Sequence, residues 1–505
     1  MTAGRSLRTA RRQRAGLVTR AFASAALFVA CAIGAAGQAA PPRPFLSPAF
    51  EDHAVLQRDV AVPVWGWHRP GATVMVTLGA ATAQAVAGAD GKWMARLPAQ
   101  PAGGPHLLKV QAPDRETERR DILMGDVWLC AGQSNMEMGV LLAQDGPAEA
   151  ARATNPAIRL FMAPHAVAAA PSSQVEGYWR VCSPAAVGST TVGWGGFSAA
   201  AYTMGVRLYE ELKVPIGLIQ VAWMGTKVCT WTSHDGLKRA GLPAAAAALP
   251  EFEVIPALAD PRMNLPSAAF NGMVAPLIPM AIKGVAWYQG ESDTSIGLAY
   301  ERSLVAMVND WRERWGDPSM PFLIVQLQGH GEPTAEPADH KLAEVREAQA
   351  NAASRLTRCG LVVTHDIGDR KNIHPKNKAE VGRRLALQAL SVAYGRVVRA
   401  SGPRLLRWSA EGGAVRLTFD AATGPLKASE LPLRGFQIAG PDRRFVWAQA
   451  LLESETVVVV RSQSVPDPKA VRYAWSAFPE GTLVNSAGLP CAPFRTDGWP
   501  VLTSP

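Results

Sequence analysis

A serine in a polar loop is the first residue of this sequence that could do chemistry. Ser134 lies in "GDVWLCAGQSNMEMGV", residues 125–140, directly after an apolar run with the length of a buried strand. A hydroxyl nucleophile is weak at neutral pH and needs a neighbouring base, usually a histidine that a carboxylate orients. Without such partners, Ser134 is equally well explained as a turn or helix-capping residue.

The candidate base is His374 in "DIGDRKNIHPKNK", residues 366–378. A lone histidine is commonly structural. This one follows an apolar run of strand length and precedes a helical pattern, so it can reach across a sheet edge to a serine that follows another strand. We therefore predict that His374 is the general base for Ser134.

Polar residues follow the predicted strands in four places along the chain: Gln133-Ser134-Asn135, Gly225-Thr226, Gln289-Gly290-Glu291 and Asp366. In an open α/β sheet, ligands bind beyond the carboxyl ends of the strands. We therefore expect these four loops to meet along one rim.

The elements that must position these loops lie in residues 121–397, where apolar runs alternate with amphipathic helical stretches. The runs are "DVWLCAG", "PIGLIQVAW", "IKGVAWYQG", "PFLIVQLQ" and "GLVVTHD"; the main helical stretches are residues 198–213, 299–315, 340–356 and 378–395. This alternation predicts an α/β fold, a largely parallel sheet with helices on both faces.

Short β patterns flank this region on both sides. Residues 41–120 combine alternating runs such as "ATVMVTLG" with the turn sequences "GADGK" and "PAGGP", and predict a small β-sandwich. Residues 398–505 return to short strands and predict a C-terminal β-rich domain. Residues 141–190 and 234–262 are rich in alanine and proline, and we expect loops there.

The N-terminus has the pattern of an export signal. Six arginines and no acidic residue among residues 1–40 account for most of the net charge of +9, and the apolar "AFASAALFVACAIGAAG" follows them. We predict a signal peptide over residues 1–40 and a periplasmic or secreted protein. An uncleaved anchor, or a lipid anchor at Cys31, is the alternative. The small remaining charge does not favour nucleic-acid binding.

Four ordered blocks resemble the bacterial sialate O-acetylesterase family within the SGNH (GDSL-like) hydrolases. They are "GDVWLCAGQSNMEM", "KVPIGLIQVAWMGT", "GVAWYQGESD" and "DIGDRKNIHPKNKAEVGRRLAL", and further similarity reaches into both β regions. The resemblance implies a flavodoxin-like three-layer α/β/α esterase domain with β-rich domains on either side.

The resemblance also implies roles for individual residues. Ser134 is the expected nucleophile and His374 the expected base. The backbone amides of Ser134 and Gly225 and the side-chain amide of Gln289 are the expected oxyanion hole, which must place donors where negative charge develops. Glycine suits position 225 because it lets the backbone approach the substrate closely.

The acid of the triad remains open in the sequence. Related enzymes carry an aspartate three or two residues before the histidine, where this chain has Lys371 and Asn372. Asp366 is our first choice. The alternatives are Asp369, Glu291, or a serine–histidine pair without a carboxylate. Two further departures from the family pattern are Met224, in place of a glycine, and Cys229, in place of a glutamate.

We expect no metal or dinucleotide cofactor, because the sequence has no HExxH, paired CxxC, Walker or GxGxxG motif in the required context. The predicted function is therefore an exported serine esterase that removes O-acetyl groups from a glycan, most like a sialate O-acetylesterase. An acetyl xylan or xyloglucan esterase and a carbohydrate-binding protein with an inactive hydrolase domain are the alternatives. Neither disulfide pairing nor oligomeric state is predicted.

Overall fold

The computed structural model describes residues 43–190, 193–242 and 260–504. The predicted signal peptide, including Cys31, and part of the 234–262 segment lie outside the described residues. No helix within the described ranges is long and apolar enough to cross a bilayer. The five cysteines that these ranges contain are all free: Cys130, Cys182, Cys229, Cys359 and Cys491.

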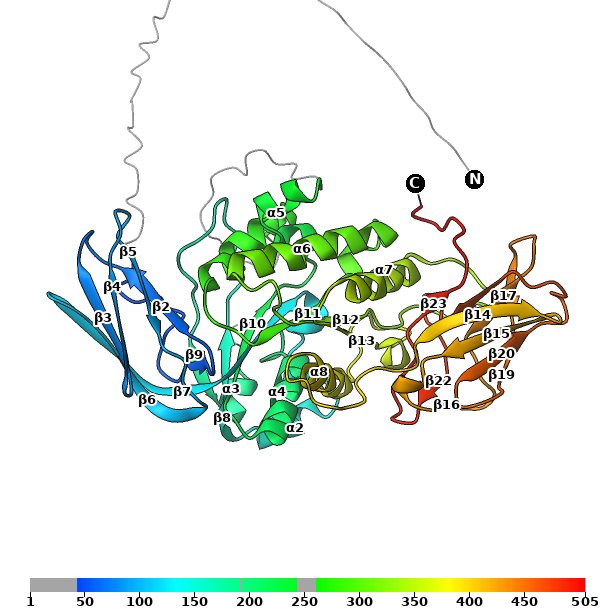
Figure 1. The fold of residues 1–505 in the computed structure, drawn as a ribbon, viewed down its shortest axis with the longest axis horizontal. Helices are drawn as coiled ribbons and strands as arrows, with labels where there is room; N and C mark the ends of the chain where they lie inside the picture. The colour runs from blue at the N-terminus through cyan, green and yellow to red at the C-terminus, as the bar shows by residue number, and fades with distance from the viewer. Residues whose placement is uncertain (1–42, 191–192, 243–259, 505) are drawn as a thin grey trace, which may run out of the picture. The chain divides into compact units, whose positions relative to one another are not determined.

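A central sheet lies between two layers of helices (Figure 1). Its strands run in the order β13-β12-β11-β7-β10-β8-β9 and are parallel, except for the edge strand β9. Their bounds are β7 Arg115–Gly132, β8 Asn155–Met162, β9 Trp179–Cys182, β10 Ile216–Ala222, β11 Gly284–Tyr288, β12 Phe322–Val325 and β13 Cys359–Val362.

The two faces of the sheet carry separate apolar cores. In β7, Val127 and Leu129 pack with α6 and α7, whereas Trp128 and Cys130 pack with α4 and α8. Every residue of β10, β11 and β12 is buried, as expected for parallel strands that are covered on both sides. The predicted α/β fold, with additional β-rich sheets, is confirmed.

The four long helices, α4, α6, α7 and α8, begin and end close to their predicted bounds, whereas α2, α3 and α5 lie in segments where loops were expected. Ser198 and Asn377 cap α4 and α8, since their side chains accept hydrogen bonds from the backbone N–H three residues further on. The helices are α1 Ser134–Glu137, α2 Gly146–Arg152, α3 Pro184–Val187, α4 Ala199–Leu212, α5 His234–Arg239, α6 Tyr300–Trp315, α7 Lys341–Arg355 and α8 Lys378–Val392.

Strand β7 joins the N-terminal β region to the central sheet without a break. Its first part pairs with β6 and β1, and its second part with β10 and β11. The predicted boundary at residue 120 falls inside this strand and stays a prediction. The preceding strands are β1 Val55–Gln57, β2 Val62–Trp67, β3 Thr73–Leu78, β4 Ala81–Val86, β5 Lys92–Leu97 and β6 Gly103–Ala112.

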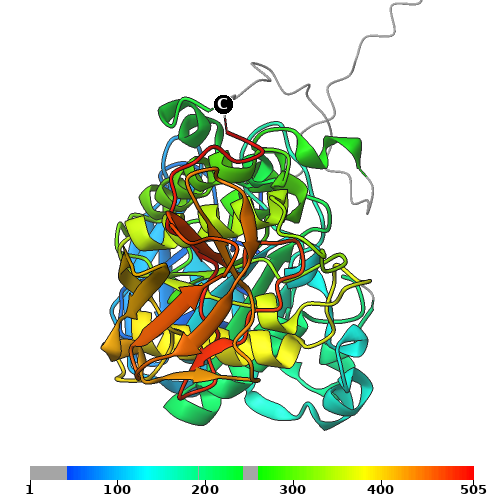
Figure 2. The same ribbon diagram turned by 90° about the vertical axis from the view of Figure 1, so that its right-hand side faces the viewer.

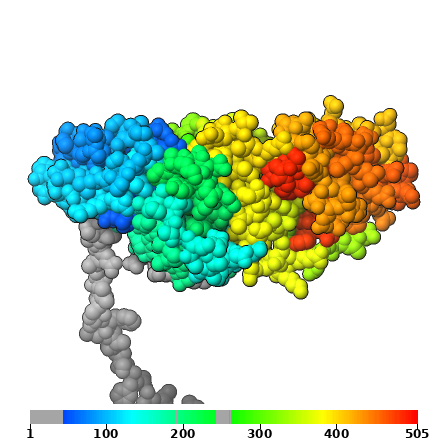
Figure 3. All heavy atoms as spheres, turned by 90° about the horizontal axis from the view of Figure 1, so that it is seen from below, coloured from blue at the N-terminus to red at the C-terminus, as the bar shows by residue number. Residues whose placement is uncertain are grey.

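The C-terminal region contains antiparallel sheets around its own apolar core, drawn in orange and red nearest the viewer in Figure 2. From the underside, Figure 3 shows red atoms from near the C-terminus against the yellow atoms of the preceding α/β region. The strands are β14 Leu405–Glu411, β15 Ala414–Phe419, β16 Leu426–Ala428, β17 Phe436–Ala439, β18 Phe445–Trp447, β19 Gln449–Leu452, β20 Val457–Arg461, β21 Ala470–Tyr473, β22 Leu483–Asn485 and β23 Phe494–Arg495.

Residues 141–190 contain β8 and β9 rather than loops alone. Strand β8 carries a buried arginine, Arg159, whose guanidinium pairs with Asp121 of β7. A buried ion pair of this kind interrupts the apolar pattern, so the strand was not recognisable from periodicity. The short helical turns are η1 Val140–Leu142, η2 Val228–Trp231, η3 Pro261–Asn264, η4 Phe270–Val274, η5 Ala275–Leu277, η6 Glu291–Asp293, η7 Gly297–Ala299, η8 His365–Ile367 and η9 Ala421–Thr423.

Candidate active site

Ser134 begins α1, directly beyond the end of β7. The turn before it requires glycine, because Gly132 has a φ of +142° and a Cβ there would lie 2.1 Å from the carbonyl oxygen of Tyr288. The Gln133 side chain accepts hydrogen bonds from the backbone of Gly290 and Ser292. The loops after β7 and β11 are therefore joined at the nucleophile position, as the rim prediction requires.

His374 lies beside Ser134. Its Nε2 is 2.9 Å from Ser134 Oγ, within hydrogen-bond distance for proton transfer. The ring of Trp194 packs edge-on against the imidazole, with 4.9 Å between centroids. Burial lowers the pKa of His374 below its ordinary value of 6.5, and the positive charges of Lys378 and His330 lower it further. The neutral imidazole that a general base requires is therefore favoured.

The backbone next to His374 is held by two side-chain amides. Asn135 Nδ2 and Gln328 Nε2 donate to the carbonyl oxygen of Ile373 at 3.0 and 2.8 Å. Both amides also donate to Oε1 of Glu291, at 2.5 and 3.1 Å. Glu291 thus orients the amides that fix the histidine loop, and no hydrogen bond joins it to His374 in the described structure.

A buried lysine lies beneath this network. Lys378, the first residue of α8, is fully buried, and its Nζ donates to Oδ1 of Asn135 at 2.5 Å. The ammonium also lies 5.4 Å from the centroid of the Tyr288 ring. Burial lowers the pKa of Lys378 to about 7, against the opposing charge of Glu291. Lys378 was not among the predicted site residues, although its place at the start of the helix after His374 could have indicated that it lies near the site.

Two backbone amides are available for an oxyanion. As the first residue of α1, Ser134 has an N–H that no residue of the helix accepts. The N–H of Gly225, in the loop after β10, has no acceptor among the described residues. Gly225 has a φ of +77°, which favours glycine at this position.

The loop that carries Gly225 is fixed by a buried carboxylate. Glu137 Oε2 accepts a hydrogen bond from the backbone N–H of Met224 at 2.6 Å, and its Oε1 lies 2.9 Å from Nε2 of His165. The His165 ring stacks on Trp223 at 4.6 Å. Glu137 lies three residues after Ser134, so α1 connects Ser134 to the loop that carries Gly225. This role of Glu137 was not predictable from the sequence, because it depends on a contact between distant segments.

Gln289 lies next to the loop that carries Gly225, and all its side-chain polar atoms form hydrogen bonds within the protein. Its Nε2 donates to the Thr226 carbonyl at 2.9 Å and to Asp293 Oδ2 at 2.6 Å, and its Oε1 accepts from the Tyr300 hydroxyl. Both amide hydrogens therefore have acceptors within the protein. Burial raises the pKa of Asp293 to about 6, although the hydrogen bond from Gln289 opposes this rise. The predicted role of Gln289 as an oxyanion donor stays a prediction.

Asp366 lies in the predicted loop, but its carboxylate pairs with Arg384 of α8. The guanidinium contacts its two oxygens at 2.7 and 2.6 Å. Burial raises the pKa of Asp366, yet the hydrogen bonds and charge of Arg384 outweigh this effect and lower it below the ordinary value. Within the described ranges no hydrogen bond joins Asp366 to His374, because Arg384 draws the carboxylate toward the helix.

Asp369 acts locally within the same loop. Its Oδ1 accepts hydrogen bonds from the backbone N–H groups of Lys371 and Asn372, and Asn372 Oδ1 in turn accepts from the N–H of His374 at 2.9 Å. This chain of turns sets the backbone conformation that leads into His374.

The departures from the family pattern lie on the oxyanion loop. The thiol of Cys229 is largely buried, and burial raises its pKa to about 11, so it is protonated at neutral pH. Met224 contributes its backbone N–H to Glu137. No cluster of three or more His, Cys, Asp or Glu side chains suited to a metal ion occurs in the part of the chain that the structure describes.

Comparison with known proteins finds relatives that are described as acetylesterases. Residues 124–391, more than half of the chain, match the family described as "Carbohydrate esterase, sialic acid-specific acetylesterase". The sialate O-acetylesterase of Homo sapiens is 30% identical over 485 residues, covering 87% of this chain and 90% of that protein. The Rattus norvegicus sialate O-acetylesterase is 28% identical over 515 residues, covering 88% and 93%.

A crystal structure described as a novel carbohydrate acetylesterase from Xanthomonas citri superposes with a TM-score of 0.81. It is 38% identical and covers 90% of this chain and 100% of that chain. With these relatives, the fold and the site define a carboxylic ester hydrolase. The chain belongs to the carbohydrate esterase family of sialic acid-specific acetylesterases, and the family predicted from the sequence is confirmed.

Proposed function

We propose that this esterase removes O-acetyl groups from a carbohydrate through an acetyl ester formed on Ser134. The observation that carries the proposal is the 2.9 Å separation between Ser134 Oγ and His374 Nε2, beside the backbone N–H groups of Ser134 and Gly225. A nucleophile, a base and oxyanion donors are the parts that acyl transfer requires.

The reaction proceeds in two halves. His374 accepts the Ser134 proton as Oγ attacks the acetyl carbon, and the developing oxyanion faces the two backbone amides. As the tetrahedral intermediate collapses, the bond between the acyl carbon and the sugar oxygen breaks, and His374 returns the proton to that oxygen. A water molecule, deprotonated by His374, then attacks the acetyl group and releases acetate and free Ser134.

In this proposal His374 works without a direct carboxylate partner. Asn135 and Gln328 hold the preceding carbonyl, and Asn372 accepts a hydrogen bond from the His374 backbone N–H. Asp366 acts indirectly, because its pair with Arg384 anchors the start of the histidine loop to α8. Of the alternatives that the sequence leaves open, this geometry favours the serine–histidine pair.

A direct test uses p-nitrophenyl acetate and the Ser134→Ala variant. We expect kcat/KM to fall at least about 1,000-fold, since the alcohol that forms the acyl-enzyme is absent. The matched control is Ser267→Ala, because Ser267 is also buried and its hydroxyl has no partner among the described residues. Equal rates for wild type and Ser134→Ala would refute the mechanism, and equal rates at the level of spontaneous hydrolysis would favour a binding protein with an inactive hydrolase domain.

A fluorophosphonate probe provides an independent check on the nucleophile. We expect mass spectrometry to find the adduct on Ser134 in the wild type and to find none on the Ser134→Ala variant. An adduct on another serine would assign the nucleophile elsewhere.

The sugar is proposed from the family, with O-acetylated sialic acid first. The family description and the names of the human and rat relatives support this choice. Acetate release should be compared on acetylated sialic acid and on acetylated xylan and xyloglucan oligosaccharides. Turnover of the plant glycans alone would replace sialate with hemicellulose as the substrate.

Export is proposed from residues 1–40. The arginine-rich start, the apolar stretch and the following prolines support a cleaved signal peptide. We expect the mature protein to begin near residue 40 and to fractionate outside the cytoplasm. N-terminal sequencing of the purified protein checks both points, and an intact Met1 would contradict them.

A further inference from the structure

A pocket of about 370 Å³ lies beside the histidine loop. Two of its lining residues adjoin the catalytic pair: Ile373 precedes His374, and Glu291 accepts a hydrogen bond from Asn135, the neighbour of Ser134. The complete lining is Glu291, Thr294, His340, Lys341, Leu342, Ile373 and Leu502. The pocket therefore lies beside the loop that carries His374, and no residue of the Gly225 loop lines it.

One wall of this pocket comes from the C-terminal tail of the chain. Leu502 lies 128 positions beyond His374 in the sequence, after the last strand of the C-terminal β region, yet it lines the pocket together with Ile373. The next residue, Thr503, is bound to α7: its backbone N–H and its hydroxyl both donate to Oε2 of Glu344. The Thr503 hydroxyl also accepts a hydrogen bond from the backbone N–H of Leu298.

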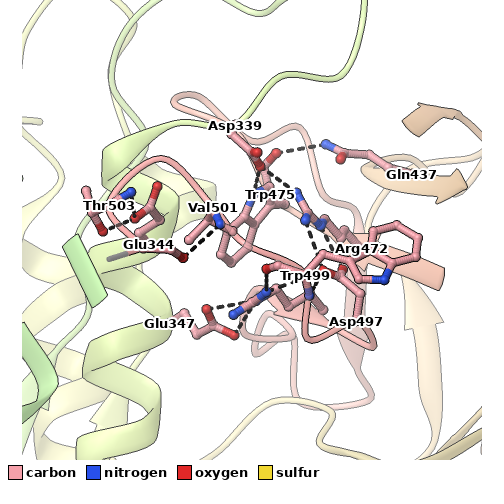
Figure 4. Close-up of polar contacts among 12 residues, drawn as sticks. Asp339, Glu344, Glu347, Gln437, Arg472, Trp475, Asp497, Trp499, Val501 and Thr503 are labelled. Atoms are coloured by element: carbon pink, nitrogen blue, oxygen red, sulfur yellow. Dashed lines mark hydrogen bonds and ion pairs between the residues drawn. The ribbon is translucent and has the colours of Figure 1, made fainter. Parts of the chain in front are cut away.

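The tail is fixed along its length rather than only at Thr503. Figure 4 shows Glu344 and Glu347 extending from α7 toward it. Val501 packs in a small apolar cluster with Ala343 and Trp475. Gly297 approaches the tail so closely that a Cβ there would lie 2.1 Å from Oγ1 of Thr503.

A charge network anchors the base of the tail. Arg472 pairs with Asp497 and with Asp339, which precedes α7. Arg495 pairs with Glu347 on α7 at 2.8 Å and donates to the carbonyl oxygen of Trp499 at 2.9 Å. These contacts join the C-terminal β region to α7, whose first residues line the pocket (Figure 4). They hold the segment that carries Leu502 against α7.

We propose that this pocket binds the sugar ring that carries the acetyl ester, and that the C-terminal tail is a specificity-determining wall of it. The inference rests on the proposed acetyl-Ser134 reaction. In that reaction His374 must protonate the leaving sugar oxygen, so the sugar lies on the histidine side while the acyl oxygen faces Ser134 and Gly225.

The lining suits a sugar better than an acyl chain. Leu342, Ile373 and Leu502 offer apolar surface to the C–H face of a ring, and Thr294, His340 and Lys341 offer polar groups to its hydroxyls. Ligand pockets are typically about 300–1,000 Å³ and mostly apolar with a few polar groups. An acetyl group of two carbons does not require a pocket of this size.

The test compares an acetylated sugar with p-nitrophenyl acetate in the Leu502→Trp variant, whose larger side chain fills the pocket. Both substrates use the same chemistry, but only the first places a sugar ring beside the histidine. We expect the ratio of kcat/KM for the sugar to kcat/KM for p-nitrophenyl acetate to fall about tenfold, mainly through KM, because binding of the ring is lost.

The matched control is Leu406→Trp. Leu406 is 56% exposed and Leu502 57%, but Leu406 lies on β14, outside the pocket, so the ratio should keep its wild-type value. Leu502→Asp provides a second variant whose side chain is smaller than leucine, and it should lower the same ratio by removing apolar contact.

An unchanged ratio in both folded Leu502 variants would overturn the pocket assignment, even if Ser134→Ala abolishes hydrolysis. If Ser134→Ala retains wild-type activity, the proposed function fails first, and the two failures are thereby distinguished.

Discussion

Lys378 donates a hydrogen bond from its buried Nζ to Oδ1 of Asn135, the residue that directly follows Ser134. Asn135 uses its amide nitrogen to hold the carbonyl of Ile373, directly before His374. One asparagine thus connects the nucleophile loop, the histidine loop and a buried cation. Lys378 is therefore linked to the histidine loop through Asn135, and its charge also lowers the pKa of His374.

The pH profile of the enzyme should reflect that charge. Burial, Lys378 and His330 together lower the pKa of His374, so kcat/KM should stay high below pH 6.5 and fall only in more acidic solution. The Lys378→Met variant lacks a positive charge that lowers the pKa of His374, so the acidic limb of kcat/KM should move to higher pH. Steady-state rates on p-nitrophenyl acetate between pH 4.5 and 8 measure this shift.

The exposed neighbour Lys376 offers a control, since Lys376→Met removes the same charge outside the buried network. The acidic limb of kcat/KM for Lys376→Met should stay closer to that of the wild type. If Lys378→Met moves the limb to lower pH, the proposed electrostatic action of the lysine is wrong.

Asp366→Asn separates a structural role from a catalytic one. The variant breaks the two-oxygen pairing with Arg384, whose side chain is only 4% exposed, and should lower the free energy of unfolding by about 1–3 kcal/mol. Because Asp366 does not contact His374, kcat/KM should fall less than about tenfold. Urea unfolding and steady-state kinetics on one preparation give both values.

The opposite result would be equally informative. A loss of about 1,000-fold or more at unchanged stability would place Asp366 in the triad, since replacing the triad aspartate in serine proteases has effects of that order. Asp369→Asn serves as the comparison, because its carboxylate holds only the backbone of the same loop.

Glu137→Gln tests how the oxyanion loop is held. The charged carboxylate accepts the Met224 N–H at 2.6 Å beside Gly225, and a neutral amide accepts more weakly. We expect kcat to fall about tenfold while KM changes little, because the Gly225 donor acts mainly in the transition state. The half-exposed Glu149→Gln variant is the control. A change in KM alone would contradict this role.

Asp293 should make stability depend on pH. Burial raises its pKa to about 6 in the folded protein, above the ordinary value of 3.8, so the folded state holds this proton more tightly than the unfolded chain. The resulting stabilisation is fully present below about pH 4 and is lost as the pH rises through about 6. Asp293→Asn cannot titrate, so the stability of the wild type relative to the variant should fall between pH 4.5 and 7.5.

Urea unfolding at these two pH values measures that difference. The exposed Asp442→Asn variant shows how much of the change any aspartate produces. If the wild type gains stability relative to Asp293→Asn as the pH rises, burial does not raise the pKa of Asp293.

Local patterns in the sequence determined most of the elements and the loops that carry Ser134 and His374. Apolar runs and amphipathic spacing are properties of neighbouring residues, so β10 to β13 and the long helices were predictable. Ser134 and His374 were expected to meet because each follows a strand of one parallel sheet, where loops from distant segments come together. The structure places His374 Nε2 2.9 Å from Ser134 Oγ, and their catalytic roles stay a prediction.

Tertiary structure alone decided which side chains pair. The buried Arg159 of β8 pairs with Asp121, Asp366 pairs with Arg384, and Gln289 is hydrogen-bonded to Thr226 and Asp293. Such pairs join residues far apart in sequence, and their geometry depends on packing rather than on local propensity. For the same reason the sequence could not show that Leu502, near the end of the chain, lines a pocket beside His374.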